Sequence, residues 1–229
     1  VIVGSGVSYI CKGAFYICSC LSDISLPIGY IWFNEDVFKG CTSLPIENDV
    51  RYADTYVVGA VNKNKTSYTI REGSRYIGYQ AFKYCKKAKN ISIPDSVTKI
   101  EEEAFYGCSN LQQIVISKNI TSISPDAFSY CTGELVINSK IVEEDCELVE
   151  RYTGLSYPRT YERSTNFWLD NSQFSKITIG NNVQKLGNYA FYGNGWKLKS
   201  VTIPESVLSI GVAALGDCKQ LYGDCEQLT

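Results

Sequence analysis

The sequence predicts a mainly β solenoid, in which short repeats stack into one elongated body. Three observations support this fold class. A phenylalanine recurs every 23 residues in neighbouring copies, a cysteine usually follows it three positions later, and short apolar segments precede it at fixed distances. Internal periods of this size indicate stacked supersecondary units. The phenylalanines of this slot are Phe15, Phe38, Phe82, Phe105, Phe128 and Phe191, and Leu215 takes the same slot in a further copy.

Each repeat has the same order of elements. A short segment with period-2 alternation, such as residues 114–116, is typical of a strand. A turn follows, often opened by a proline such as Pro94, because proline fixes φ and donates no hydrogen bond. A second short extended segment comes next, at residues 97–100 in one copy. The Ala-Phe segment then suggests a helical or 3-10 turn that carries the phenylalanine inward and returns the chain.

Stacking is the expected source of stability, because about eight apolar side chains per coil point the same way and one coil cannot bury them. Stacked coils pair their strands at about 4.8 Å, and each large apolar side chain that becomes buried contributes roughly 1.5–3 kcal/mol. Chain entropy opposes this at a similar scale. We expect one solenoid over residues 1–229, a right-handed superhelix of about nine coils and about 45 Å, with the helical or 3-10 turns on its convex side.

Two segments break the period. At residues 45–70 we expect an irregular hairpin, in which two β-branched runs flank the turn-forming residues 62–65. At about residues 133–176 we expect an aromatic insertion, whose GELVINSKIVEE segment predicts strand, turn and strand. The rest of it is either a binding loop on a rigid scaffold or a lid over a gap in the stack. Its candidate ligand-binding residues are Tyr152, Tyr157, Tyr161 and Trp168, near Phe167 and Phe174.

Ten cysteines allow either a secreted disulfide framework or small buried side chains. Six of them share one slot of the repeat, so we predict that they belong to the structural core as small apolar residues. A bridge between Cys218 and Cys225 stays an alternative. Zinc is disfavoured because the chain has no C-x-x-C pair and no histidine. The six slot cysteines are Cys18, Cys41, Cys85, Cys108, Cys131 and Cys218.

The composition excludes several classes of function. The absence of histidine removes Ser-His-Asp and Cys-His catalysis and most zinc hydrolases. The net charge of −2, without a long basic run, argues against nucleic acid. No stretch of 18 or more apolar residues is present, so we expect no transmembrane span. The carboxylates of residues 101–103 and 143–145 are expected to be solvated. We therefore expect no enzyme, no metal and no cofactor.

The repeat C-x-x-L-x-x-I-x-I-P-x-S-V-x-x-I-x-x-x-A-F resembles the Treponema pallidum-type leucine-rich repeat of BspA-like surface proteins. The segments SLPIENDVRYADTYVVGAV and GELVINSKIVE are similar to inter-repeat segments of BspA-like proteins of Bacteroides and related gut anaerobes. This resemblance implies a cell-surface or secreted adhesion module whose partner is a host protein or a glycan. The chain opens inside a repeat strand and has no Met, so we expect a piece of a longer protein or a mature form without its leader.

The binding face is expected on the strands, because the side chain between two core residues of a strand points outward. These outward residues are small and form a shallow, uncharged column, flanked by Lys176, Lys199, Gln112 and Gln113. Such a column suits extended contact with a protein or a polysaccharide better than a deep pocket would. A structural spacer and a carboxylate-based glycosidase are the alternatives. The candidate binding residues are Thr69, Ser92, Gln113, Val115, Thr178 and Thr202, and Ile2 and Ser25 extend the same column.

Overall fold

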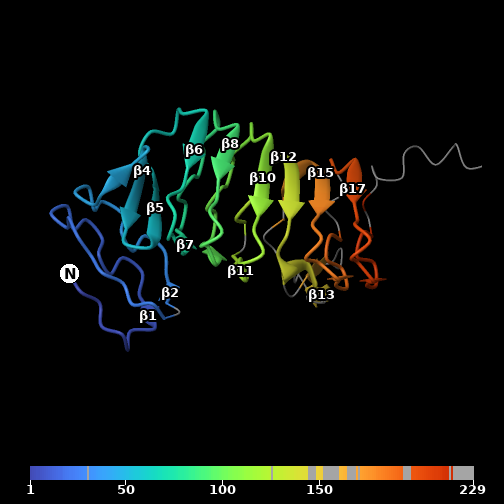
Figure 1. Ribbon diagram of the computed structural model, residues 1–229, viewed down its shortest axis with the longest axis horizontal. Helices are drawn as coiled ribbons and strands as arrows, with labels where there is room; N and C mark the ends of the chain where they lie inside the picture. The colour runs from blue at the N-terminus through green and yellow to red at the C-terminus, as the bar shows by residue number, and fades with distance from the viewer. Residues whose placement is uncertain are drawn as a thin grey trace, which may run out of the picture.

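The chain forms a mainly β solenoid of about seven turns with a spacing of about 23 residues, so the expected fold class is confirmed and the expectation of nine coils is too high. Figure 1 shows the coils side by side along the long axis. The computed structural model describes residues 1–29, 31–124, 126–143, 148–151, 160–163, 169, 171–192, 197–216 and 218, with the backbone alone at 148–151 and 160–163.

The first strands of the coils from β6 onward form one six-stranded parallel sheet, which we call the first-strand sheet. Figure 1 shows its strands as a row along the body. Each strand buries alternate residues, as Gln113–Ile116 does with the pattern exposed, buried, exposed, buried. In sheet order the strands are β6 (Ser67–Thr69), β8 (Asn90–Ser92), β10 (Gln113–Ile116), β12 (Thr132–Ile137), β15 (Gln173–Ile179) and β17 (Ser200–Thr202).

The second extended segments form another six-stranded sheet, the second-strand sheet. Its strands are β3 (Ile46–Glu47), β4 (Val50–Ala53), β5 (Tyr56–Ala60), β7 (Tyr76–Ile77), β9 (Lys99–Ile100) and β11 (Ser122–Ile123). The first three pair antiparallel and the rest parallel. The remaining pairs are β1 (Tyr9–Ile10) with β2 (Trp32–Phe33), β16 (Lys185–Leu186) with β18 (Ser209–Ile210), and β13 (Leu148–Arg151) with β14 (Thr160–Arg163).

The Ala-Phe turns are not helical, which corrects the sequence expectation. In the coil of Phe105, Glu103 and Gly107 both have positive φ, at 54° and 72°. A left-handed residue ends a helix of L-residues after one turn, so each corner is a pair of tight turns. The same two positions are left-handed in the coils of Phe15, Phe82 and Phe128. A 3-10 helix, η1, spans Lys140–Glu143.

The irregular hairpin turns at a different place from the one expected. β4 and β5 pair antiparallel, Ala53 opposite Tyr56, around a two-residue turn that begins with Asp54 at φ 51°. Residues 62–65 instead connect the two sheets, because β5 and β6 belong to different sheets. Likewise, the second part of GELVINSKIVEE is η1 rather than a strand. β12 and β15 lie in the first-strand sheet, so regular structure extends into both ends of the segment assigned to the insertion.

Phenylalanine rings stack through the core. The Phe105 ring lies 5.5 Å from Phe82 and 5.2 Å from Phe128, with 4° between the planes in both pairs. These three rings are fully buried, and Phe191 is buried in its own coil. Phe15 stacks on Phe38 but stays partly exposed, because no coil of this chain packs on its other side.

Five of the six slot cysteines are buried, and the thiols of four of them donate hydrogen bonds to backbone carbonyls rather than serving as apolar filler alone. The Sγ of Cys108 donates to the carbonyl of Phe82 at 3.2 Å, and Cys131 donates to Phe105 at 3.0 Å. Cys41 and Cys218 donate to Phe15 and Phe191 in the same way. Cys18 is exposed, so the prediction of a buried side chain is wrong there. It lies in the first coil, where no preceding phenylalanine carbonyl faces it.

Candidate functional site

The first-strand sheet presents one row of side chains to solvent, which we call the outer face. The pairing registers align one residue from each strand. Val115 is an apolar member of this row, and its side chain is 38% exposed. Ile2 and Ser25, expected in the same row, instead pair with each other in a separate bridge. The row consists of Thr69, Ser92, Val115, Val136, Thr178 and Thr202.

A second outward row runs beside the first and carries charge, which sequence reasoning missed. Glu134 of β12 lies opposite Gln113 and Lys176 in the registers. Its Oε1 accepts a hydrogen bond of 2.6 Å from the Thr178 hydroxyl and lies 3.0 Å from Lys176 Nζ. Its Oε2 accepts one of 3.0 Å from the Gln113 amide. The outer face therefore has a fixed carboxylate near its centre, in the row that flanks the expected column of small uncharged side chains.

These three partners also determine the ionisation of Glu134. The hydrogen bonds from Thr178, Lys176 and Gln113 hold the pKa of this carboxyl below its ordinary value, because each donor stabilises the charged form. The side chain remains partly exposed, so the cluster is accessible from solvent. Neighbouring Gln112 and Lys199 are exposed as well.

The candidate binding side chains of the aromatic insertion lie outside those that the structure describes. Tyr152, Tyr157 and Trp168 lie outside the described residues, and Tyr161 lies in β14, where the backbone alone is described. Phe174 is different: it is 3% exposed and its ring lies 6.2 Å from Phe128. It therefore belongs to the core and not to a loop.

Three tyrosines form a ladder that the sequence analysis did not single out. Tyr106 lies between Tyr84 and Tyr130, with ring centroids 5.5 and 5.1 Å apart and edge-to-face geometry. Tyr84 is 49% exposed and Tyr130 is 42% exposed. The ammonium of Lys83 lies 4.8 Å from the Tyr106 ring centroid. The ladder lines an open groove of about 410 Å³ together with Lys86, Gly107, Ser109 and Gln173. In the sequence, each of these tyrosines follows the slot phenylalanine by one or two positions, and this pattern could have indicated the ladder.

The carboxylates of residues 101–103 are not all solvated, which corrects the expectation. Glu101 is 6% exposed and lies 3.1 Å from the ammonium of Lys99, which is itself buried and 3.9 Å from the Trp32 ring centroid. Burial raises the pKa of Glu101 although Lys99 opposes the shift. Glu103 pairs with Lys83 at 2.5 Å.

Glu101, Glu102 and Glu35 line a small cavity of about 200 Å³ beside Trp32. Glu101 is ion-paired with Lys99 and Glu35 with Lys12. Glu102 is then the carboxylate of this cavity that has no ion pair within the described chain, and burial raises its pKa. The paired geometry fits a role in holding the N-terminal coils against β9. In the second cluster, Glu143 accepts a hydrogen bond from the Gln184 backbone, and residues 144 and 145 lie outside the described residues.

The described residues also bear on metal binding, membrane spans and disulfides. Among the residues that the structure describes, no group of three or more histidine, cysteine or acidic side chains is arranged to hold a metal ion. Within the same residues, no helix has the length and apolar character needed to cross a bilayer. The cysteines described are all free thiols, and Cys146 and Cys225 lie outside the described residues, so the alternative bridge from Cys218 to Cys225 cannot be placed.

The comparisons with solved structures give distant likenesses. A leucine rich cell surface protein from Faecalibacterium prausnitzii is 25% identical over 91% of this chain and 48% of its own, with a TM-score of 0.35. The Treponema pallidum leucine-rich repeat protein is 21% identical over 96% of this chain and 77% of its own, with a TM-score of 0.35. A leucine-rich repeat protein from Bacteroides ovatus is 20% identical over 96% of this chain and 64% of its own, with a TM-score of 0.31. The chain spans about half the length of the first.

The family comparison is specific. No curated protein matches the chain significantly. The family described as BspA type leucine rich repeat region matches in six copies, over residues 1–58, 61–153 and 146–223. These matches cover most of the sequence and agree with the repeat register of the phenylalanine slot and the strand pairs. The chain therefore belongs to the BspA-type leucine-rich repeat family.

Proposed function

We propose that this chain is a cell-surface or secreted adhesion module that recognises a host protein, or a glycan, through its outer face or its aromatic insertion. Protein on the outer face is the first choice, because the Glu134 cluster supplies a fixed charge on a broad and shallow surface. A carboxylate already held by Thr178, Lys176 and Gln113 loses little side-chain freedom on binding. The family resemblance supports an origin in Bacteroides or a related gut anaerobe.

The shape of the outer face also favours a macromolecule over a small ligand. Small ligands prefer concave pockets, and the three described cavities are lined by residues of the turns and the N-terminal junction rather than by the outer row. Charge complementarity across such a surface contributes specificity and association rate. The expected partner surface therefore carries a basic group that faces Glu134.

The test is a screen of the purified chain against extracellular-matrix proteins and glycans, followed by a double change of Ser92 and Val115 to arginine. The double variant should abolish binding and leave the melting temperature nearly unchanged, because both side chains point to solvent. A matched control, Ser43→Arg with Asn182→Arg, adds the same charge at exposed turns elsewhere. Binding that survives the double change but is lost in Trp168→Ala would transfer the function to the insertion. A chain with no ligand in the screen would be a structural spacer.

A glycan on the tyrosine ladder is the second candidate, because exposed rings in a row offer stacking faces to successive sugar units. Tyr84 and Tyr130 are about half exposed on either side of Tyr106. If a glycan is the ligand, Tyr84→Ala and Tyr130→Ala should each weaken binding at least severalfold, while the arginine pair on the outer face leaves it unchanged. The reverse pattern would remove the ladder from consideration.

A further inference from the structure

The Ala-Phe turns of neighbouring coils are joined by a regular set of backbone hydrogen bonds, which we call the turn ladder. The amide of Phe82 donates to the carbonyl of Ala104 at 2.7 Å, and that of Tyr84 donates to Tyr106 at 2.8 Å. The same positions are joined between the first and second coils, where Phe15 donates to Val37 at 3.0 Å. Each turn thus directs its amides at the carbonyls of the next coil.

This ladder is interrupted after the second coil. Ala60 takes the phenylalanine slot of the third coil, because its amide makes the equivalent bond to Ala81 at 2.8 Å. Residues 58–60, however, belong to β5 and pair with β4. A cavity of about 250 Å³ lies where the turn at residues 36–40 would otherwise meet residues 58–61, and residues of both segments line it.

Three backbone amides of the turn therefore lack their usual acceptors. Asp36, Phe38 and Gly40 correspond to Gln80, Phe82 and Tyr84 of the regular stack, and all three line the cavity. Their amides have no hydrogen-bond acceptor within the described chain. By the repeat symmetry, these amides point toward the cavity. Amides that face an open cavity can donate hydrogen bonds to an anion held there.

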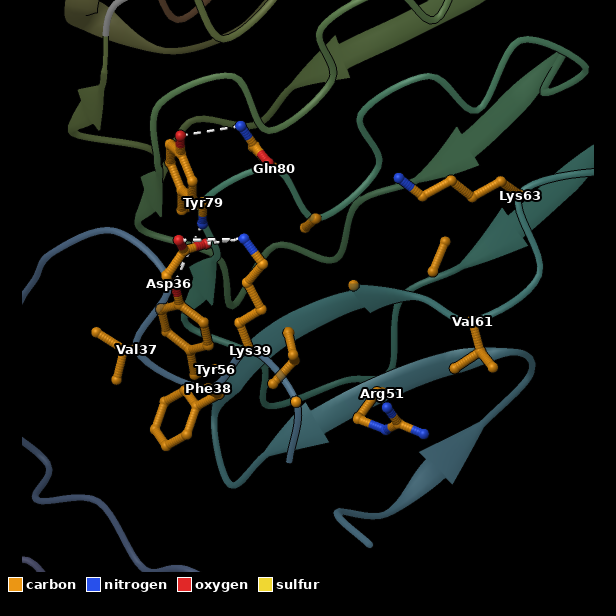
Figure 2. Close-up of a pocket in the computed structure, with 15 residues that line it drawn as sticks. Asp36, Val37, Phe38, Lys39, Arg51, Tyr56, Val61, Lys63, Tyr79 and Gln80 are labelled. Atoms are coloured by element: carbon orange, nitrogen blue, oxygen red, sulfur yellow. Dashed lines mark hydrogen bonds and ion pairs between the residues drawn. The ribbon is translucent and has the colours of Figure 1, made fainter. Parts of the chain in front are cut away.

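Cationic side chains from three segments line the same cavity. Lys39 comes from the turn, Arg51 from β4 and Lys63 from the segment after β5, as Figure 2 shows. The Nε of Arg51 is buried and has no hydrogen-bond partner among the described residues. Asp36 is the one carboxylate of the lining, and Lys39 pairs with it at 3.2 Å. Lys63 donates to the Lys83 carbonyl at 2.7 Å.

We propose that this cavity binds a carboxylate group. A guanidinium and backbone amides are all donors, and a carboxylate satisfies several of them at once through charge-assisted hydrogen bonds. Of the three lining cations, Lys39 is paired with Asp36 and Lys63 donates to the Lys83 carbonyl. Arg51 is therefore the cation expected to face a bound carboxylate. The cavity has room for a carboxylate and a few attached atoms, so the source is the free C-terminus of a peptide or a sugar acid. The site is separate from the outer face and does not depend on the function proposed for that face.

The experiment is a titration of the ¹⁵N-labelled chain with sodium acetate at constant ionic strength, against a chloride blank. The amide signals of Asp36, Phe38 and Gly40 should shift saturably, and Arg51→Gln should weaken the apparent affinity about tenfold or more, because a hydrogen bond to a charged group is lost. Lys118→Gln, which removes an exposed charge elsewhere, should leave the affinity unchanged. Shifts that do not saturate, or that are equal in Arg51→Gln, would overturn the proposal.

Two additional measurements use the unmodified chain: amide hydrogen exchange and a comparison of carboxylate ligands. Amide hydrogen exchange at Phe38 should be much faster than at Phe82 and should slow when acetate is added; equal protection at both positions would show an intact ladder and overturn the proposal. Acetyl-dialanine with a free carboxyl, its amide and glucuronate then identify the source. Tighter binding of the free acid than of glucuronate indicates a peptide terminus, and the opposite order a sugar acid. Equal binding of the peptide acid and its amide would contradict recognition of the carboxylate.

Discussion

The regular stack at residues 82–131 and the junction at residues 38–82 solve the same packing problem in different ways. In the regular stack, the Phe105 ring packs between the rings of Phe82 and Phe128. The Cys108 thiol donates to the Phe82 carbonyl, and the amides of Phe82 and Phe105 donate to the next coil. Phe105 is therefore enclosed on both faces. The repetition makes stability close to a sum over identical interfaces.

At the junction, tyrosines replace the missing repeat elements. Tyr56 packs 5.3 Å from Phe38 and 4.4 Å from Phe33, which fills the core where Ala60 occupies the phenylalanine slot. Its hydroxyl accepts a hydrogen bond of 3.1 Å from the Tyr79 amide, and the Tyr76 hydroxyl accepts one of 3.1 Å from the Ile31 amide. Phenol oxygens thus accept hydrogen bonds from two backbone amides of the junction. The turn at residues 36–40 receives no such substitute, and there the cavity lies.

The largest expected effect is at the centre of the regular stack. Phe105→Ala should lower the free energy of unfolding by about 3–5 kcal/mol, because it removes a ring packed on both faces and leaves a cavity. Phe15→Ala should cost only about 1–2 kcal/mol, because that ring is partly exposed and stacks on one side. Denaturant unfolding of the two variants measures both. Equal losses would mean that the regular stack has no advantage over its end.

The next effect concerns the buried Lys99–Glu101 ion pair, whose ammonium also contacts the Trp32 ring of the N-terminal coils. Lys99→Met should cost about 3 kcal/mol at pH 7, because it leaves the buried Glu101 carboxylate without its cation. The pKa of Glu101 is already raised in the folded state and rises further without Lys99. Stability is then retained below the ordinary carboxyl pKa and lost as pH rises through the raised value. The deficit should shrink from pH 7 toward pH 4.5 in urea titrations, and a pH-independent deficit would contradict this.

Thiol reactivity should separate the first coil from the others. Cys11, Cys18 and Cys20 are exposed and should be labelled at the rate of a free thiol, whereas labelling of the five buried cysteines should be slower by about a hundredfold or more, because it requires local opening. Burial also raises the pKa of the Cys85 thiol to about 11, which lowers its thiolate fraction at pH 8. Mass spectrometry after timed labelling gives the rates. Slow labelling of Cys18 would restore the original prediction that all six slot cysteines are buried.

Replacement of one buried thiol should have a smaller effect on stability. Cys108→Ser should cost about 1–2 kcal/mol, because the shorter C–O bond moves the donor away from the Phe82 carbonyl and leaves a hydroxyl in an apolar core. Cys18→Ser should change the free energy of unfolding by less than about 0.5 kcal/mol, because its side chain is exposed. Thermal unfolding of the two variants gives the comparison. A loss at Cys18 equal to that at Cys108 would exclude a role for burial.

Features that depend on the period could be predicted from the sequence, and features that depend on contacts between distant coils could not. The slot of Phe105 fixes the core register, the strand positions and most of the outer row. The left-handed turn residues escaped notice because they include Glu103, Tyr84 and Ile17, which are not typical of positive φ. Here the coil geometry overrides local preference.

The candidate site was partly predictable for the same reason. Thr178 and Val115 follow from strand alternation, but Glu134 does not, because its segment lacks the repeat motif that would place it in the sheet. Its position follows from the pairing of β12 with β10 and β15, which places Glu134 opposite Gln113 and Lys176. Trp32 above Lys99 is a contact between coils of different sheets, and no local pattern reports it.

A small stability effect is expected at the Glu134 cluster, where the consequence for binding should be large. Glu134→Gln removes an exposed carboxylate whose partners stay solvated, so its cost at pH 7 should be less than about 1 kcal/mol. Because the folded-state pKa of Glu134 lies below its ordinary value, its contribution is present above the ordinary pKa and is lost as pH falls through the lowered one. Wild type and variant should therefore converge in stability as pH falls through the lowered pKa. If the outer face is the binding surface, the same variant should weaken a basic partner at least tenfold at pH 7, and unchanged affinity with unchanged stability would remove this cluster from the binding surface.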